Sequence, residues 1–293
     1  MRSLLFVPGD SERKLAKSLD SGADALILDL EDSVTPEAKP KARTMTRDFL
    51  KSARAKAKRP RLLVRTNALP TGLVDHDLEA VVAARPDGIM LPKCESAADV
   101  VLLDAKLSVA EALAGVEDGA SKIFVIVTET AASLFGLGGY AGASTRLDGL
   151  TWGAEDLSAD LGASAIRHAD GGFTDPYRLA RALCLFAAAA ARVMPIDSVY
   201  ANFQDLDGLR ADAEAGNRDG FVAKMAIHPG QVSIINEIFT PTKSALEWAR
   251  GVLAAFAANP GAGVLSYRGE MIDKPHIDRA ERLLARAKSL GLV

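Results

Sequence analysis

The segment Ile123-Phe124-Val125-Ile126-Val127 is an unbroken apolar run in which four of five residues are β-branched. A half-exposed strand alternates apolar and polar residues, whereas a strand in a parallel sheet is covered on both faces and is apolar throughout. Leu26-Ile27-Leu28 has the same continuous pattern. Each run is followed by polar residues and then by a longer stretch with helical spacing. This order predicts a parallel α/β sheet.

The same unit recurs along the chain and predicts eight strands. They are expected at Ser3–Pro8, Ala25–Leu30, Arg61–Thr66, Gly88–Pro92, Ile123–Thr128, Leu147–Gly153, Ser198–Ala201 and Val222–Ile227. Helix starts lie between them: Asp10-Ser11 suits a cap, and Thr35-Pro36-Glu37 combines a cap, a first-turn proline and a first-turn acid. Eight βα units over about 240 residues match a closed (β/α)8 TIM barrel better than a doubly wound sheet.

The residues after Thr240 exceed what closure of a barrel requires. We expect a helix, a turn, a short polar segment and a last helix, at Lys243–Ala258, Asn259–Gly263, 264–273 and Pro275–Gly291. The chain is therefore divided into a barrel catalytic domain, residues 1–240, and a C-terminal helical extension, residues 241–293.

The composition is that of an ordinary globular protein. Hydrophobic residues make up 48%, charged residues 25%, and the net charge is only −3, with no tail of one sign. Cys94 and Cys184 lie far apart without CxxC spacing, which indicates buried thiols in a reducing compartment. The first apolar run ends at Pro8, too early for a signal peptide, and Ala182–Ala191 is about half of a membrane span. We expect a cytoplasmic enzyme that binds neither nucleic acid nor membrane.

Charged and polar residues collect at the carboxyl ends of the expected strands, where α/β barrels build their active sites. In chain order these ends carry Glu31, Asp32, Arg65, Asn67, Lys93, Glu129, Glu155, Asp156 and His228. Any one of them could instead cap the helix that follows. Several carboxylates with an arginine and a lysine at one mouth favour a functional site.

Glu129 and Asp156 end adjacent strands, so their carboxylates could reach one ion. Magnesium takes one or two protein carboxylates and keeps water and substrate oxygens, whereas calcium needs more oxygens and zinc prefers nitrogen or sulfur. The pair predicts a magnesium site in which manganese could substitute, although both residues could also cap helices. Arg65 is a planar fork suited to a carboxylate or an enolate oxygen, or else a salt-bridge partner of Glu31 or Asp32.

Motifs of several other enzyme classes are absent. We find no GxSxG, HExxH, P-loop or first-turn GxGxxG, which argues against serine hydrolases, zincins and dinucleotide enzymes. The cluster Gly136–Gly139 follows no strand and is interpreted as a turn. A glycine-rich loop, Gly162–Pro176, leads into an alanine-rich helix.

Seven ordered segments carry a family resemblance that spans almost the whole chain. They are Arg2–Gly9, Leu28–Val34, Val64–Asn67, Leu91–Lys93, Thr128–Ala131, Gly153–Asp156 and Lys224–Pro229. Together they resemble the signatures of the citrate-lyase β-subunit-like and malyl-CoA lyase family, within the HpcH/HpaI aldolase/citrate lyase superfamily. The resemblance implies a TIM barrel with a C-terminal helical lid and a magnesium-dependent lyase that acts on acyl-CoA.

The resemblance also implies residue roles. The residues that match Glu129 and Asp156 bind magnesium in that family, and the arginine that matches Arg65 binds substrate oxygen at the metal. Tyr267–Pro275 resembles the family's lid, whose aspartate, here Asp273, reaches an active site that is commonly a neighbouring subunit's. From the residues alone, Asp273 would be a helix cap.

The family binds CoA along its first βα loop, where Phe6, Arg13 and Lys17 would meet the adenine and its phosphates. Arg13 and Lys17 are four residues apart and share a helix face, although solvated helix charges have the same spacing. Supporting roles at the site are expected for Glu31, Asp32, Lys93, Glu155 and His228.

The expected reaction is retro-Claisen cleavage, or the reverse condensation, of malyl-CoA, citramalyl-CoA or citryl-CoA, with an acyl-CoA and a 2-oxo acid as products. Magnesium would acidify the hydroxyl group, Arg65 would hold negative charge, and Asp273 would transfer a proton at the α-carbon. Alternatives are a malyl-CoA thioesterase, a CoA-independent 2-oxo acid aldolase, and a non-catalytic subunit that binds CoA or an acyl carrier protein. We expect a homotrimer or hexamer with the lid shared between subunits.

Overall fold

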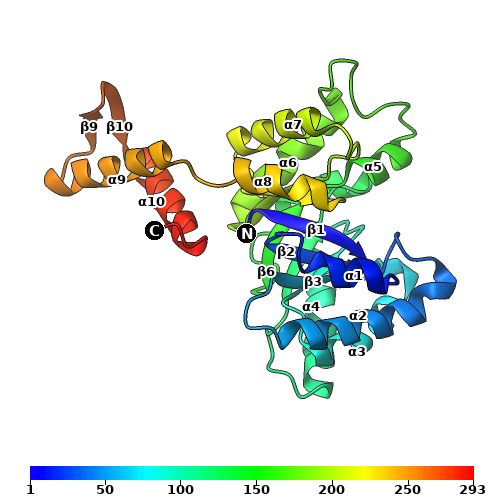
Figure 1. Cartoon of the computed structure of the whole chain (residues 1–293). Coiled ribbons are helices and arrows are strands. Elements are labelled where there is room, and N and C mark those ends of the chain that lie inside the picture. The colour runs from blue at the N-terminus through cyan, green and yellow to red at the C-terminus, as the bar shows by residue number, and fades with distance from the viewer. The chain divides into compact units, whose positions relative to one another are not determined.

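The computed structural model describes all residues from Met1 to Val293, and the chain forms two compact units. The larger unit runs from Arg2 to Asn236, and the smaller comprises Glu237–Val293 with Met1. Each unit has a buried apolar core of its own. Figure 1 shows the elements of both units along the chain.

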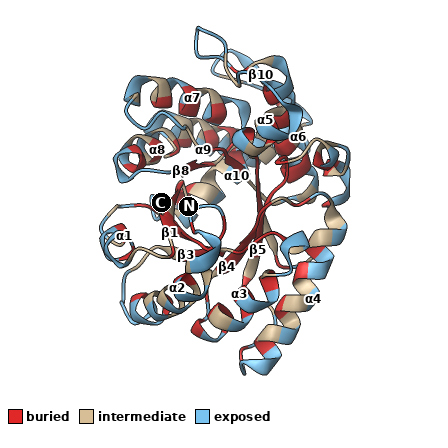
Figure 2. Ribbon diagram, turned by 90° about the vertical axis from the view of Figure 1, so that its right-hand side faces the viewer, coloured by how far each residue is buried: buried red, intermediate tan, exposed pale blue.

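The larger unit is a closed barrel of eight parallel strands, in which each strand pairs with the next and β8 pairs with β1. The strands are β1 (Ser3–Pro8), β2 (Ala25–Asp29), β3 (Arg61–Arg65), β4 (Gly88–Leu91), β5 (Lys122–Ile126), β6 (Leu147–Thr151), β7 (Met194–Asp197) and β8 (Ala223–Ala226). In Figure 2 the strands are buried at the centre and the helices around them expose their outer sides. The predicted (β/α)8 barrel is confirmed.

Helices follow the strands and cover the outside of the barrel. They are α1 (Glu12–Ser18), α2 (Lys39–Arg54), α3 (Val74–Val81), α4 (Ala97–Leu113), α5 (Ala154–Leu161), α6 (Asp175–Ala191), α7 (Leu206–Asp219) and α8 (Val232–Ile238). Between β5 and β6 the chain makes two 3-10 turns, Ala132–Phe135 and Leu137–Gly139, which confirms the predicted turn. Both α5 and α6 lie between β6 and β7, joined by the glycine-rich loop.

Helices begin near the predicted signals, but the hydrogen bonds that cap them differ from one helix to the next. Ser11 is the N-cap residue of α1, and Thr35 precedes a 3-10 turn that leads into α2, but neither side chain makes a capping hydrogen bond. At α4, by contrast, Ser96 and Asp99 form a complete capping box that satisfies two backbone N–H groups.

Phe124 of β5 is fully buried, and its ring lies beside the two neighbouring strands. The neighbouring strands carry glycine beside its ring: a Cβ would fall 3.0 Å from the ring at Gly88 and 2.8 Å at Gly149. Because an interior packed at crystal-like density cannot absorb such overlaps, the large residue requires the two small ones.

The prediction for the seventh strand was wrong. The strand is Met194–Asp197, and the predicted segment Ser198–Ala201 is the loop that follows it. Pro195 lies within β7 opposite Leu150 of β6, and its carbonyl accepts a hydrogen bond from the N–H of Val222. A proline lacks the N–H group but keeps its acceptor, so the short strand still pairs on both sides.

The smaller unit contains α9 (Lys243–Ala258), an antiparallel hairpin of β9 (Val264–Tyr267) and β10 (Glu270–Asp273), and α10 (Lys274–Ser289). The segment expected to be merely polar and short is therefore a hairpin. Ala249, Val252, Ile272 and Ala280 form the core of this unit. A methyl group at Gly251 would collide with the Tyr267 ring, which fixes how closely α9 approaches the hairpin.

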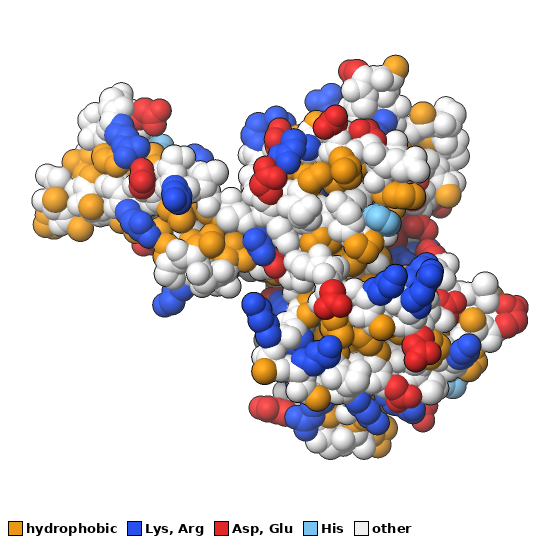
Figure 3. Space-filling view, viewed as in Figure 1, with side chains coloured by type: hydrophobic (Ala, Val, Ile, Leu, Met, Phe, Trp, Pro, Cys, Tyr) orange, Lys and Arg blue, Asp and Glu red, His pale blue; other side chains and the backbone are white.

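The state of the cysteines, the length of the helices and the distribution of surface charge are features of the chain as a whole. Cys94 and Cys184 are both buried and unpaired, as predicted. No helix has the length and apolar character needed to span a bilayer. Over the face shown in Figure 3, acidic and basic side chains are interspersed rather than segregated.

Candidate active site

A cavity of about 660 Å³ lies among the carboxyl ends of the strands. The predicted site residues among its lining are Phe6, Arg13, Lys17, Asp32, Arg65, Glu129, Glu155, Asp156 and His228. Glu31 and Lys93 form ion pairs with residues of that lining. Asn67 is used elsewhere, because its side chain donates to Asp77 of α3 at 2.7 Å.

Glu129 follows β5 and is only 3% exposed. The backbone N–H of Lys93 donates to its Oε2 atom. A Cβ at Gly153 would fall 2.6 Å from Glu129 Cγ, so this carboxylate needs the glycine beside it. Burial, with the like charges of Glu31 and Asp156, raises the pKa of Glu129 to about 8. A cation at this carboxyl group would reverse the shift.

Asp156 lies in the first turn of α5, and its side chain is 36% exposed. The helix starts at Gly153 without a side-chain cap. Its first N–H groups therefore remain available to an anion beside the Asp156 carboxylate. Lys93 Nζ lies 3.4 Å from Asp156 Oδ1.

Arg65, the last residue of β3, is held by two carboxylates. Its Nε and Nη2 atoms each donate to Asp29 at 2.7 Å, and Nη1 lies 2.9 Å from Glu31 Oε2. The guanidinium group also lies over the Phe6 ring at 4.8 Å. Burial alone would raise the pKa of Asp29, but the bidentate bond from Arg65 holds that pKa below its usual value. Glu31 was a predicted alternative partner of Arg65, whereas Asp29 was missed.

Lys93 connects the remaining carboxylates. Its Nζ atom lies 2.6 Å from Glu31, 2.9 Å from Asp32 and 3.4 Å from Asp156. Its φ of 49° is left-handed, which costs free energy for a residue other than glycine. The strained backbone turns the N–H toward Glu129 while the side chain reaches the other acids.

These residues form what we call the Glu129 cluster: Asp29, Glu31, Asp32, Arg65, Lys93, Glu129 and Asp156. Five carboxylates meet only two cations, and a divalent cation would offset most of this excess of negative charge. No group of three or more His, Cys, Asp or Glu side chains is placed to enclose an ion. Two oxygen donors with open positions for water and substrate fit magnesium or manganese.

Three basic side chains of α1, Arg13, Lys14 and Lys17, line the same cavity and form no ion pair. His228 also lines the cavity, but its contacts are local: its ring stacks on Phe203 at 5.0 Å, and its Nδ1 accepts from the Gly230 N–H at 3.1 Å. The α1 cations are therefore open to an anionic ligand, whereas His228 caps the turn after β8.

Asp273 lies in the smaller unit, at the end of β10, and is the N-cap residue of α10. Its Oδ1 atom lies 2.6 Å from His276 Nδ1, and the two side chains form a reciprocal capping box. The helix-cap interpretation of Asp273 thus describes its contacts within its own unit.

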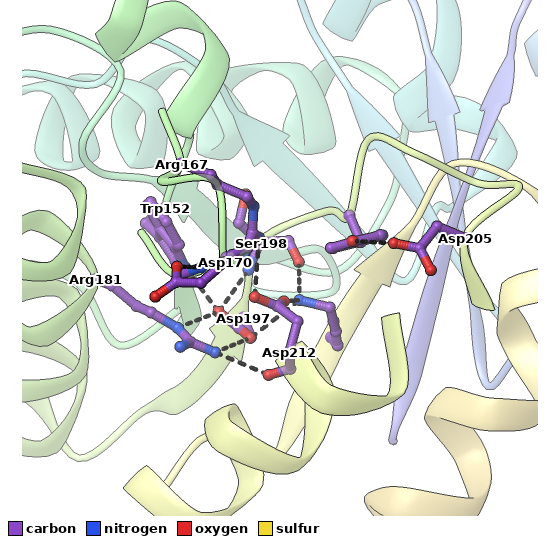
Figure 4. Close-up of polar contacts among 12 residues, drawn as sticks. Trp152, Arg167, Asp170, Arg181, Asp197, Ser198, Asp205 and Asp212 are labelled. Atoms are coloured by element: carbon purple, nitrogen blue, oxygen red, sulfur yellow. Dashed lines mark hydrogen bonds and ion pairs between the residues drawn. The ribbon is translucent and has the colours of Figure 1, made fainter. Parts of the chain in front are cut away.

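A second group of buried charges was not predicted from the sequence. Trp152, which follows β6, donates from Nε1 to Asp197 at 2.8 Å (Figure 4). Asp197 also binds Arg181 of α6 at 2.7 Å and Lys224 of β8 at 3.0 Å. Lys224 in turn lies 2.6 Å from Asp212 of α7. These side chains join four elements of the barrel wall.

We call this group, with Arg167, the Asp197 cluster. Arg167 lies 2.9 Å from Asp212, so the cluster holds three cations and two carboxylates. Burial alone would raise the pKa of Asp197, but Lys224 and Arg181 hold it well below its usual value. The sequence places charged residues within short apolar strands. Such a charge requires a buried partner, but the sequence does not identify that partner.

The barrel and its cavity define a class: an α/β-barrel protein with a carboxylate-rich cavity at the carboxyl ends of its strands. The family model described as HpcH/HpaI aldolase/citrate lyase matches residues 2–229, and a model described as C-C bond lyase of the TIM-barrel fold matches residues 177–292. The chain belongs to the HpcH/HpaI aldolase/citrate lyase family, as the sequence segments suggested.

Three similar proteins indicate the range of this family. A (3S)-malyl-CoA thioesterase of Cereibacter sphaeroides is 37% identical, with 99% of this chain and 95% of the relative covered. An L-malyl-CoA/beta-methylmalyl-CoA lyase of Rhodobacter capsulatus is 34% identical, with 98% and 94% covered. The crystal structure of CitE from Mycobacterium tuberculosis with magnesium, acetoacetate and coenzyme A is 35% identical, with 98% of each chain covered and a TM-score of 0.79.

Proposed function

We propose that this protein is a magnesium-dependent carbon–carbon lyase. It cleaves, or in reverse forms, a β-hydroxyacyl-CoA of the malyl-CoA type, with an acyl-CoA and a 2-oxo acid as the other partners. The observation that carries this proposal is the carboxylate excess of the Glu129 cluster in a cavity that three unpaired α1 cations also line. Relatives named for malyl-CoA chemistry support the same reaction class.

Glu129 and Asp156 would hold the cation, with open positions left for substrate oxygens. The chemistry that a bound divalent cation supplies is Lewis-acid polarisation of the substrate hydroxyl and carboxylate. Arg65, fixed by Asp29, contributes a stationary positive charge at the wall where negative charge develops. The uncapped first turn of α5 offers N–H groups to the substrate carboxylate.

The CoA part would lie along α1. Arg13 and Lys17 are close to the cavity and carry no carboxylate partner, which suits the phosphates of CoA. The Phe6 ring, which lies against the Arg65 guanidinium group, offers an aromatic surface to the adenine of CoA. Lys93 positions both proposed metal carboxylates, through its ion pair with Asp156 and its backbone N–H on Glu129. Glu31 and Asp32 in turn hold the Lys93 side chain.

Asp273 would exchange a proton with the α-carbon, as acid in cleavage and as base in condensation. We propose that it does so in the active site of a neighbouring subunit, within a homotrimer or hexamer. Hybrids of Asp273→Asn and Arg65→Ala subunits test this sharing, because some hybrid sites would combine both intact residues. Recovered activity would support it, whereas confirmed subunit exchange without activity would contradict it.

The decisive experiment follows the products of malyl-, citramalyl- and citryl-CoA by mass spectrometry, with the purified protein and magnesium. Appearance of acetyl-CoA and a 2-oxo acid is expected, and EDTA should stop it. Asp48→Asn, at an exposed position of α2 remote from the cavity lining, is the matched control and should cleave normally.

The second candidate is a thioesterase acting on the same compounds. It is favoured by the 37% identical (3S)-malyl-CoA thioesterase. The same assay separates the two, because hydrolysis yields the free hydroxy acid and CoA without a 2-oxo acid.

A further inference from the structure

The substrates named above differ in one substituent at the carbon that becomes the carbonyl of the 2-oxo acid. That substituent is hydrogen in malyl-CoA, methyl in citramalyl-CoA and carboxymethyl in citryl-CoA. Only the last requires a place for a second carboxylate. Because a buried carboxylate without a partner is costly, unpaired cations on the inner wall of the cavity decide which substituent fits.

The two cations of the Glu129 cluster are already committed. Arg65 donates two hydrogen bonds to Asp29, and its Nη1 atom lies 2.9 Å from Glu31 Oε2. Lys93 Nζ is shared among Glu31, Asp32 and Asp156. Because five carboxylates already surround these two cations, a second substrate carboxylate would meet an excess of negative charge here.

The wall formed by the strands is otherwise apolar. Leu5 of β1, Ile126 of β5, Trp152 and Met225 of β8 line the cavity, and each is nearly or fully buried. The only polar atom of Trp152, Nε1, points away to Asp197, so the indole offers the cavity carbon atoms alone.

Behind Trp152 lie further cations, but they do not serve the cavity. Arg181 and Lys224 bind Asp197, and Lys224 also binds Asp212 (Figure 4). Neither Arg181 nor Lys224 belongs to the cavity lining. Ser198 is the one hydroxyl-bearing residue on this side, and a single hydroxyl does not neutralise a carboxylate.

The remaining arginine and lysine side chains of the lining, Arg13, Lys14 and Lys17, all belong to α1, and His228 makes the local contacts described above. They follow β1 by several residues and come from one short helix rather than from the strand wall. In the proposed function they bind the phosphates of CoA, which all three thioesters share. They therefore do not discriminate among the three hydroxy acids that the thioesters carry.

We propose that the acid part of the substrate carries a single carboxylate, as in malyl-CoA and citramalyl-CoA, and that citryl-CoA is disfavoured. This inference rests on the proposed function. In cleavage the bond between the carbinol carbon and the α-carbon breaks, and the hydroxyl loses its proton. Glyoxylate or pyruvate leaves, and the thioester enolate gains a proton at carbon to give acetyl-CoA.

The test compares kcat/KM for consumption of the three thioesters by the full-length protein with magnesium. We expect citryl-CoA to be consumed roughly 10- to 100-fold less efficiently than the better of the other two, the effect of one unpaired buried carboxylate. Equal or better consumption of citryl-CoA would overturn the inference while leaving the lyase proposal intact.

If none of the thioesters is consumed, the proposed function fails, and a binding measurement decides the inference. Glyoxylate, pyruvate and oxaloacetate are titrated into the magnesium-loaded protein by calorimetry. Tighter binding of a monocarboxylate supports the inference, and tighter binding of oxaloacetate overturns it.

A variant that supplies the missing cation sharpens the comparison. Met225→Lys places an ammonium group on the wall and should raise the citryl-CoA to malyl-CoA preference ratio several-fold, whereas the uncharged Met225→Leu should keep the ratio. Circular dichroism confirms folding of both variants. An unchanged ratio in a folded Met225→Lys protein would count against the role of the apolar wall.

Discussion

The barrel contains two clusters of charged side chains, and they differ in the balance between carboxylates and cations. In the Asp197 cluster three cations meet two carboxylates, and the charges lie behind the cavity wall. In the Glu129 cluster five carboxylates meet two cations, and several of its members line the cavity. Each carboxylate of the Asp197 cluster has cationic partners within the chain, so these ion pairs can hold elements together, whereas the excess of carboxylates in the Glu129 cluster favours a cation from outside the chain.

The two central acids show the difference most clearly. Glu129 and Asp197 are both buried, yet their pKa values shift in opposite directions. Burial and neighbouring carboxylates raise the pKa of Glu129 to about 8, while Lys224 and Arg181 lower that of Asp197 despite its burial. The raised pKa of Glu129 agrees with the cation site proposed there, and the lowered pKa of Asp197 reflects its ion pairs with Lys224 and Arg181.

The largest effect should come from removing a ligand of the proposed cation. Glu129→Ala and Asp156→Ala should each lower turnover by about a thousandfold or more, since Lewis-acid assistance contributes several kcal/mol. Both proteins should remain folded, because residues at this face of a barrel serve chemistry more than stability. Steady-state kinetics with circular dichroism check the prediction, and undiminished turnover of the unaltered protein in EDTA would contradict the metal assignment.

The corresponding change in the Asp197 cluster should act on stability. Lys224→Met leaves Asp197 and Asp212 buried with less compensation, and breaking a buried ion pair costs about 3–5 kcal/mol. The midpoint of urea unfolding should fall accordingly, while metal binding to the folded fraction is retained. Arg47→Met, in an exposed ion pair, is the matched control and should change the midpoint little. Equal midpoints for the two variants would remove the structural role assigned to the cluster.

A subtler change keeps the charge of the Glu129 cluster and alters only geometry. Arg65→Lys retains a cation but loses the fork that binds Asp29 twice and Glu31 once. Turnover should fall roughly 100-fold, because a point ammonium cannot be held in the same place. The kinetics are compared with those of Arg61→Lys, at the other end of β3. A wild-type rate for Arg65→Lys would reduce Arg65 to a salt-bridge residue.

Local patterns predicted most of the fold. The bounds of β1 and α9 agree residue for residue with the expected segments, because both have strong patterns and clear boundaries. β7 was misplaced because Pro195 disfavours a strand, whereas Val199 and Tyr200 downstream have strand-forming side chains. The sequence alone does not reveal that Pro195 still pairs through its carbonyl group.

The gathering of charged residues at one cavity could be predicted, because parallel strands end at one face. Which side chains pair with one another at that face could not be predicted. Arg65 meets Asp29 because β2 and β3 pair in a register that places the two residues side by side. The Asp197 cluster joins residues of α6, α7, β7 and β8, and such a combination of distant segments has no local signature.

The last expected effect, which for Glu129 is confined to the metal-free protein, is a pH dependence that should reverse between the two clusters. In the metal-free protein Glu129 binds a proton up to about pH 8, whereas in the unfolded chain it loses that proton near pH 4.5. Because the folded state holds more protons in this window, its stability should fall as the pH rises from about 4.5 to about 8. For Asp197 the sign is opposite: its contribution is complete above pH 3.8 and is lost as the pH falls below it. Glu129→Gln, which imitates the protonated acid, should remove the decline, and magnesium should remove it in the unaltered protein by favouring the carboxylate. Thermal unfolding midpoints measured with EDTA and with magnesium across the window test this. If unaltered protein and Glu129→Gln lose stability in parallel without metal, another group causes the decline, and Glu129 is not held protonated by its neighbours.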